Sequence, residues 1–81
     1  MMNNSKLTIS AYYRLGILER ILRVIRHRGA HVVTMDMQVL ENNMLGMNIT
    51  VQSERAITLV ANQLQKLIDV TDVQVESLSQ A

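Results

Sequence analysis

The stretch that decides the fold is residues 33–52, VTMDMQVLENNMLGMNITVQ. Apolar and polar residues alternate in it twice, from Val33 to Val39 and again from Met47 to Gln52. This period of two is typical of half-buried strands. Between the two runs, residues 41–43 (Glu-Asn-Asn) have the composition of a turn. The stretch therefore predicts two neighbouring strands joined as a hairpin.

A helical period flanks the hairpin on both sides. Before it, apolar residues recur at i, i+3, i+4 and i+7, and Gly29 follows where such a helix would end. After it, Ser53 is suited to cap a second helix and Glu54 to occupy its first turn. The two apolar stripes consist of Leu18, Ile21, Leu22 and Ile25, and of Ile57, Val60, Ala61, Leu64, Leu67 and Ile68. Each stripe predicts an amphipathic helix.

Alternation returns near both ends of the chain, in residues 7–11 and again at Val73 and Val75. The element order is therefore βαββαβ, which predicts an α+β, ferredoxin-like fold with a four-stranded antiparallel sheet and two helices on one face. We expect the strand order 4-1-3-2 and a polar, solvent-facing opposite face. The whole chain, residues 1–81, is expected to form a single domain with its core between about residues 6 and 78.

The composition argues against several classes of function. Hydrophobic residues make up 48% of the chain, yet it has no Trp and no Phe, so the core must be aliphatic. The formal net charge of +1 favours neither nucleic acid nor an acidic membrane surface. There is no Cys, which excludes disulfides and thiolate metal sites. Because no apolar run approaches the roughly 18 residues of a membrane span, we expect a cytoplasmic protein.

Two other activities known for βαββαβ folds find little support. RNA-binding domains of this topology stack bases on aromatic residues of the open sheet face. The corresponding positions here are Thr8, Ser10, Asn48 and Thr50. An acylphosphatase-like enzyme would use Arg14 and Asn48, but its phosphate loop needs more glycine than Gly16 provides.

Catalytic and metal sites are also disfavoured. His27 and His31 are the only histidines, and no carboxylate is spaced to complete a metal-binding set with them. No Ser, His and Asp arrangement for nucleophilic catalysis is evident. The sequence therefore indicates a non-catalytic domain that binds a partner or a small effector.

The first helix offers two surfaces for a partner. Ile17 and Val24 widen its apolar band, either as part of the core or as a surface packed on a neighbouring subunit. Arg20, Arg23 and Arg26 lie away from that band. They are candidates for contacts with a catalytic subunit, and the alternative is an ordinary solvated face.

The second strand is expected to pair with a second copy of the chain. It lies at the edge of the predicted sheet, and residues 32–39 contain one charge, Asp36, and no proline, so they protect the edge poorly. A right-handed crossover places the first helix near the same edge. The predicted homodimer interface contains Ile17, Val24, Val32 and Thr34.

Several features of the chain resemble a known family. The βαββαβ order, a loop that ends in Gly16 and a glycine that opens the second strand are similar to ACT domains. Three segments narrow the resemblance, and they are LERILRVIRHRGAHV at residues 18–32, NITV at 48–51 and QLQKLIDV at 63–70. Within that family they resemble the regulatory small subunits of acetolactate synthase, isozyme II most closely. The similarity covers nearly the whole chain.

The resemblance implies a role in branched-chain amino-acid synthesis. Such subunits bind and activate a large catalytic subunit, which carries thiamine diphosphate, magnesium and FAD, so no cofactor is expected in this chain. Several of them also confer feedback inhibition by valine. An ACT module that senses an amino acid for another metabolic enzyme is the alternative.

The family's effector site implies a set of positions around the loop and the start of the second strand. These are Tyr13, Arg14, Leu15, Gly16, Ile17, Leu18, His31 and Val32. ACT effector sites often place Asn or Asp and Pro before the glycine, and an Asn where this chain has His31. Because Tyr13 and Leu15 bring bulk instead of those groups, we expect valine to bind weakly or not at all.

Overall fold

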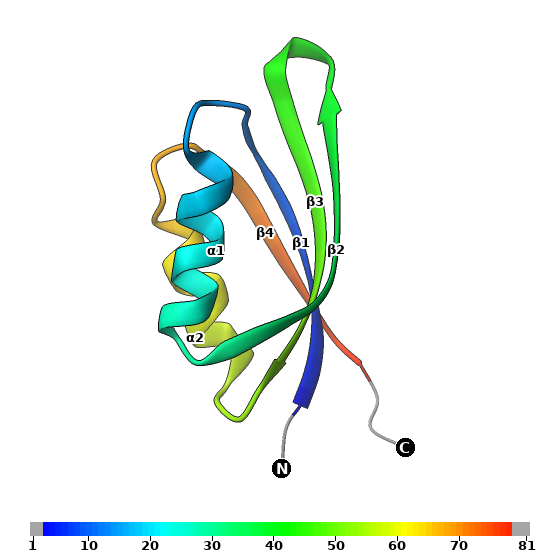
Figure 1. The fold of residues 1–81 in the computed structure, drawn as a ribbon, viewed down its shortest axis with the longest axis vertical. Helices are drawn as coiled ribbons and strands as arrows, with labels where there is room; N and C mark the ends of the chain where they lie inside the picture. The colour runs from blue at the N-terminus through cyan, green and yellow to red at the C-terminus, as the bar shows by residue number, and fades with distance from the viewer. Residues whose placement is uncertain (1–2, 79–81) are drawn as a thin grey trace.

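The computed structural model describes residues 3–78 and has the predicted order of strands and helices (Figure 1). The elements are β1 (Asn3–Tyr12), α1 (Ile17–His27), β2 (Ala30–Leu40), a 3₁₀ turn (Glu41–Asn43), β3 (Met44–Ser53), α2 (Ile57–Gln65) and β4 (Val70–Ser77). The strands form one antiparallel sheet in the order β2-β3-β1-β4, and both helices lie on the same face of it. This confirms the ferredoxin-like fold. Within residues 3–78, neither helix has the length and hydropathy that crossing a membrane requires.

The core lies between the two helices and the two central strands. Leu7 pairs with Ile49 and Ile9 with Met47, so the apolar residues of β1 and β3 share the face that the helices cover. The helices contribute Ile17, Ile21 and Ile25 from α1, and Val60, Ala61 and Leu64 from α2. All of these side chains are buried and aliphatic, as the composition predicts.

Two glycines in the left-handed conformation set the ends of α1. Gly16 has φ 83°, and the turn that it completes lets Ile17 N donate a hydrogen bond to Arg14 O at 3.1 Å. Gly29 has φ 80° and donates to Arg26 O at 3.0 Å, so it ends the helix as predicted.

The start of α2 differs from the prediction. Ser53 is the last residue of β3, and it does not cap the helix. Its Oγ accepts a hydrogen bond from Arg55 N at 3.0 Å, which forms a local turn, and α2 begins only at Ile57. The expected cap at Ser53 and the helical position of Glu54 were therefore wrong.

Strand β2 has the predicted faces but not the expected burial. Met35, Met37 and Val39 pair with buried residues of β3, so they face the side of the sheet that carries the helices. They are nevertheless 43%, 40% and 54% exposed, because the helices pack over the central strands and leave this edge uncovered. A register shift between Val32 and Thr34 inserts Val33 as a bulge.

Candidate functional site

A groove runs between α1 and the uncovered face of β2. Two hollows lie along it, and Glu19 contributes to the lining of both. One hollow, which we call the loop hollow, is at the β1–α1 loop and extends to Met37. The other, which we call the far hollow, is at the beginning of β2 and extends to Met35. Because exposed apolar side chains are concentrated here, the groove is the candidate functional site.

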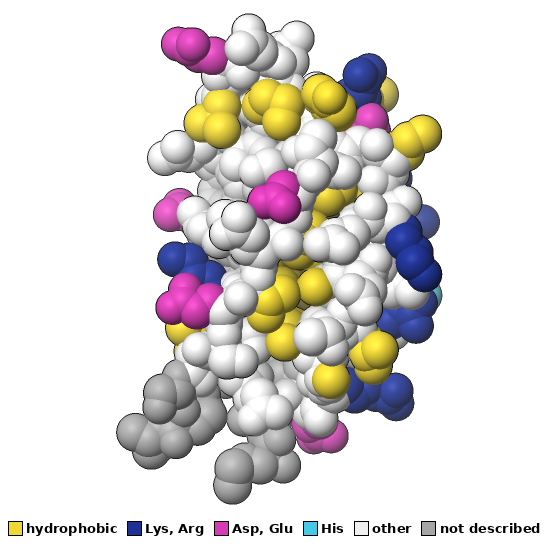
Figure 2. All heavy atoms as spheres, turned by 180° about the vertical axis from the view of Figure 1, so that it is seen from behind, with side chains coloured by type: hydrophobic (Ala, Val, Ile, Leu, Met, Phe, Trp, Pro, Cys, Tyr) yellow, Lys and Arg dark blue, Asp and Glu magenta, His cyan; other side chains and the backbone are white. Residues whose placement is uncertain are grey.

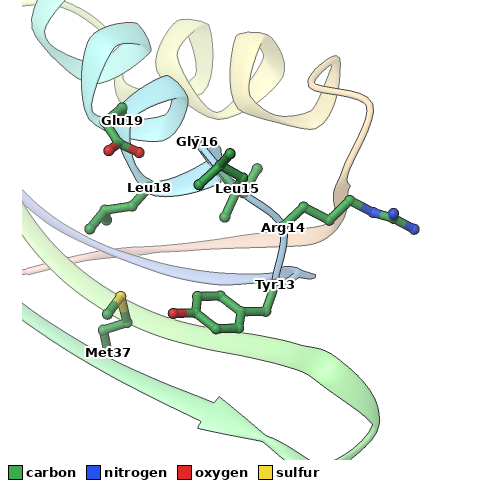
Figure 3. A pocket seen from close by; sticks show the side chains of 8 residues that line it. Tyr13, Arg14, Leu15, Gly16, Leu18, Glu19 and Met37 are labelled. Carbon is green, nitrogen blue, oxygen red and sulfur yellow. The ribbon is translucent and has the colours of Figure 1, made fainter.

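The loop hollow has a volume of about 390 Å³. Its lining comprises Tyr13, Arg14, Leu15, Gly16, Ile17, Leu18, Glu19 and Met37. The ring of Tyr13 extends toward Met37, whereas the guanidinium of Arg14 points away from the hollow (Figure 3). Leu15 is 102% exposed, so its side chain touches almost nothing in its own chain.

The far hollow is larger, about 570 Å³. Its lining comprises Glu19, Leu22, Arg23, Ile25, Arg26, Ala30, His31, Val32 and Met35. Its apolar residues come from the inner side of α1 and from β2, while Arg23 and Arg26 are exposed on the helix. The hollow is therefore an apolar depression beside basic side chains.

The structure brings together most, but not all, of the effector-site residues predicted from the sequence. The six from Tyr13 to Leu18 line the loop hollow, although Ile17 is only 1% exposed and its N–H is already bonded to Arg14 O. His31 and Val32 line the far hollow instead. His31 also pairs with Gln52, which puts its side chain on the opposite side of the sheet from Val32. One chain therefore does not assemble all eight residues.

The structure also places the predicted dimer-interface residues on different surfaces of the molecule. Ile17 belongs to the core and offers no surface to a partner. On the helix, Val24 falls on the same side as Arg20, which reaches Asp69 after α2 and so faces away from β2. Thr34 pairs with Thr50 on the open face, and Val32 is the one of the four predicted residues, all within the described part of the chain, that both lines the groove and is exposed. The half-buried apolar residues of α1 that border the groove are Leu18 and Leu22.

An ionic cluster around Asp69 holds the β1–α1 loop in place, and the sequence interpretation missed it. Arg14 Nε lies 3.1 Å from Asp69 Oδ1, and Arg20 Nη2 lies 2.8 Å from Oδ2. The backbone joins the same loops, because Tyr12 N donates to Asp69 O at 2.8 Å. Arg20 Nε also donates to Gly16 O at 3.4 Å. Arg14 and Arg20 are therefore structural residues and not simply solvated cations.

Basic residues remain exposed on α1 after this pairing. Arg23 and Arg26 are exposed and form no salt bridge within residues 3–78. Lys and Arg side chains gather along one flank of the molecule, the flank on which the helices lie (Figure 2). Of the three arginines predicted to contact a catalytic subunit, only Arg23 and Arg26 are thus free to do so.

The open face of the sheet does not form the RNA-binding or acylphosphatase-like sites considered from the sequence. Asn48 accepts a hydrogen bond from Thr8 Oγ1 at 3.1 Å, while Arg14 is engaged by Asp69, so the two residues do not converge on an anion. Tyr12, Met44 and Leu40 form a cross-strand apolar row near the hairpin end, and Tyr12 is the only aromatic residue on this face within residues 3–78. The described part of the chain contains no cluster of three His, Cys, Asp or Glu residues that could hold a metal ion.

The sequence is similar to that of known proteins. The ACT domain family matches residues 13–73. The chain is 40% identical over 73 residues to the acetolactate synthase isozyme 2 small subunit of Escherichia coli (strain K12), and the match spans 89% of this chain and 84% of that protein. The small subunit of the same name from Shigella flexneri matches with the same identity and coverage.

Solved structures support the fold. The ACT domain from GTP pyrophosphokinase of Chlorobium tepidum superposes with a TM-score of 0.80 at 15% identity, over 94% of this chain and 100% of that domain. A protein of unknown function from Galdieria sulphuraria superposes with a TM-score of 0.86 at 16% identity, and this chain spans 48% of its length. At these identities the likeness concerns the fold alone.

Proposed function

We infer the function from the premise that this chain belongs to the ACT domain family and, within it, to the small subunits of acetolactate synthase isozyme 2. It is thus a regulatory domain of branched-chain amino-acid synthesis. We propose that it works in the cytoplasm, has no turnover of its own, and binds and activates a large catalytic subunit. Thiamine diphosphate, magnesium and FAD would reside on that subunit. The observation that carries the proposal is the 40% identity over 73 residues, nearly the full length of both chains.

The geometry of the groove supports a role in binding other chains. An apolar strip along an unpaired edge strand is costly to leave in water and is suited to contact with another protein. The alternative, an ACT module that senses an amino acid for a different metabolic enzyme, would use the same groove.

We propose that two copies pair through β2 and α1. Pairing of the two β2 edges in antiparallel fashion would extend the sheet across both copies. The groove residues Leu18, Leu22, Val32, Met35 and Met37 would then be covered. These replace Ile17, Val24 and Thr34 as the residues expected to meet across the two-fold axis.

We propose further that valine is a weak effector or none. A bound amino acid needs donors for its carboxylate, and among residues 3–78 Arg14 is the only cation that lines the loop hollow. Arg14 is paired with Asp69 and points outward, and the N–H of Ile17 is already used. His31 is held at the other end of the groove.

Reconstitution tests this function directly. Adding the purified chain to the isozyme 2 catalytic subunit is expected to raise acetolactate formation, whereas the chain alone should form none. The activated complex should keep its rate when valine is added, and calorimetric titration of the chain with valine should give no saturable heat. Failure to activate would contradict the subunit assignment, and saturable binding with matching inhibition would contradict only the statement about valine.

The basic face of α1 is our candidate for the contact with the catalytic subunit. The double variant Arg23→Ser/Arg26→Ser is expected to need about tenfold more chain for half-maximal activation, because each exposed ion pair contributes up to about 1 kcal/mol. The control is Arg55→Ser/Lys66→Ser, which removes the same charge from exposed positions outside α1. Sedimentation should show that both variants keep the oligomeric state of the unchanged chain. Equal activation by both double variants would refute the docking role.

A further inference from the structure

We infer that Leu15 of each copy inserts into the far hollow of the other copy, so that this residue anchors the homodimer. The inference rests on the proposed function, and specifically on the homodimer proposed there. It assigns a partner to the most exposed apolar side chain in the described part of the chain.

The loop that carries Leu15 has backbone hydrogen bonds on both sides of this residue. Tyr13 N donates to Asn43 O at 2.7 Å, and Ile17 N donates to Arg14 O at 3.1 Å. The residues on both sides of Leu15 are fixed as well, since Arg14 pairs with Asp69 and Gly16 O accepts from Arg20 N at 3.1 Å. Because the backbone on both sides of Leu15 is already held, burying this leucine requires ordering of its side chain alone, as expected of an interface anchor.

A two-fold axis through the middle of β2 would bring Leu15 of one copy to the far hollow of the other. Strand β2 spans Ala30–Leu40, so its midpoint is near Met35. When two antiparallel β2 strands pair about that midpoint, the Met37 end of one copy lies beside the Val32 end of the other. Leu15 lines the hollow at the Met37 end, and the far hollow lies at the Val32 end. The same operation places the second Leu15 in the first copy's far hollow, as a closed dimer requires.

The two ends of the groove are also complementary in chemistry. The far hollow offers Leu22, Val32 and Met35 to an apolar side chain. Glu19 lines both hollows and so lies between them, Arg14 of the loop hollow is paired with Asp69, and Arg23 and Arg26 border the far hollow. The two-fold arrangement brings Glu19 of one copy toward these arginines of the other. Exposed rim charges of opposite sign guide the alignment but add little to affinity, so the dimer does not depend on them and both arginines remain available to a catalytic subunit.

Mixed cysteine variants test the contact, because the natural chain contains no Cys. Leu15→Cys and Val32→Cys are made as separate chains of different mass, mixed, and oxidised mildly. A disulfide-linked dimer containing one of each chain is expected, since the two positions meet only between copies. The control mixes Leu15→Cys with Val75→Cys, an exposed position on β4 at the opposite edge of the sheet, and should yield little of the mixed dimer.

A second measurement does not depend on cross-linking. Leu15→Ala is expected to raise the dissociation constant of the dimer by about tenfold or more. Leu59→Ala, the same change at an exposed position on α2, should leave it unchanged. If the unchanged chain is a dimer but the mixed disulfide is absent and Leu15→Ala dimerises normally, the inference is overturned and the dimer stands. If the unchanged chain is a monomer at high concentration, both the inference and the proposed dimer are overturned, and activation in the reconstituted enzyme still reports separately on the regulatory role.

Discussion

A chain that carries Met35→Asp is expected to sediment as a monomer at concentrations where the unchanged chain sediments as a dimer. Met35 lines the far hollow on β2 and is 43% exposed in the single chain, so an aspartate there remains hydrated and the fold should tolerate it. In the dimer the same carboxylate would be enclosed among apolar side chains from both copies. Burying a carboxylate costs several kcal/mol, which exceeds the roughly 1 kcal/mol that an exposed arginine at the border of the hollow, Arg23 or Arg26, would return as an ion pair, and is enough to abolish a moderate association.

The matched control for this variant is Ile68→Asp. Ile68 is more exposed than Met35, and it lies in the α2–β4 connection and lines neither hollow of the groove. The Ile68→Asp chain should stay dimeric, and far-ultraviolet circular dichroism should show that both variants are folded. A Met35→Asp chain that remains dimeric would place the interface elsewhere on the molecule.

Asp69→Ala is expected to lower the free energy of unfolding by about 1–3 kcal/mol, because the change leaves Arg20 without its partner in a partly buried position. The side chain of Asp69 is 14% exposed, and its 2.8 Å contact with Arg20 should account for most of the effect. Arg14 is 64% exposed, so its pairing should contribute little. In a domain of this size each kcal/mol lowers the Tm by about 4–8 °C.

Thermal unfolding followed by circular dichroism measures this change, with all chains at the same concentration. Asp72→Ala is the control, since Asp72 is an exposed carboxylate on β4 that accepts a hydrogen bond from Gln74 Nε2 at 3.2 Å and forms no salt bridge within residues 3–78. Arg20→Ala should reproduce most of the loss and Arg14→Ala little of it. Equal Tm values for Asp69→Ala and Asp72→Ala would mean that the ionic cluster does not stabilise the loop.

The fold could be predicted from the sequence because its signals are local and mutually consistent. Alternation around residues 41–43 specifies the hairpin, and the stripe that contains Ile21 and Ile25 specifies a helix beside it. Gly29 ends that helix through its own backbone conformation. Each of these features depends on neighbours only a few residues away.

The features that could not be predicted depend on contacts and packing between elements, which the local sequence does not specify. Arg20 and Asp69 are 49 residues apart in sequence, and nothing local distinguishes Arg20 from the solvated arginines of the same helix. The exposure of Met35 and Met37 follows from where the helices pack, which an alternating pattern does not specify. Ser53 has the composition of a helix cap, but a nearer backbone partner, Arg55, takes its hydroxyl.

The placement of the two tyrosines has a spectroscopic consequence. They are the only aromatic residues in the sequence, and Tyr12 and Tyr13 are 44% and 50% exposed at one end of the molecule, outside the aliphatic core. Unfolding should therefore change their absorbance and fluorescence little. Covering of Tyr13 by another chain should change them more, because its ring would leave water. The ultraviolet signal of this protein thus reports on what touches its hairpin end, while its folding is reported by the backbone.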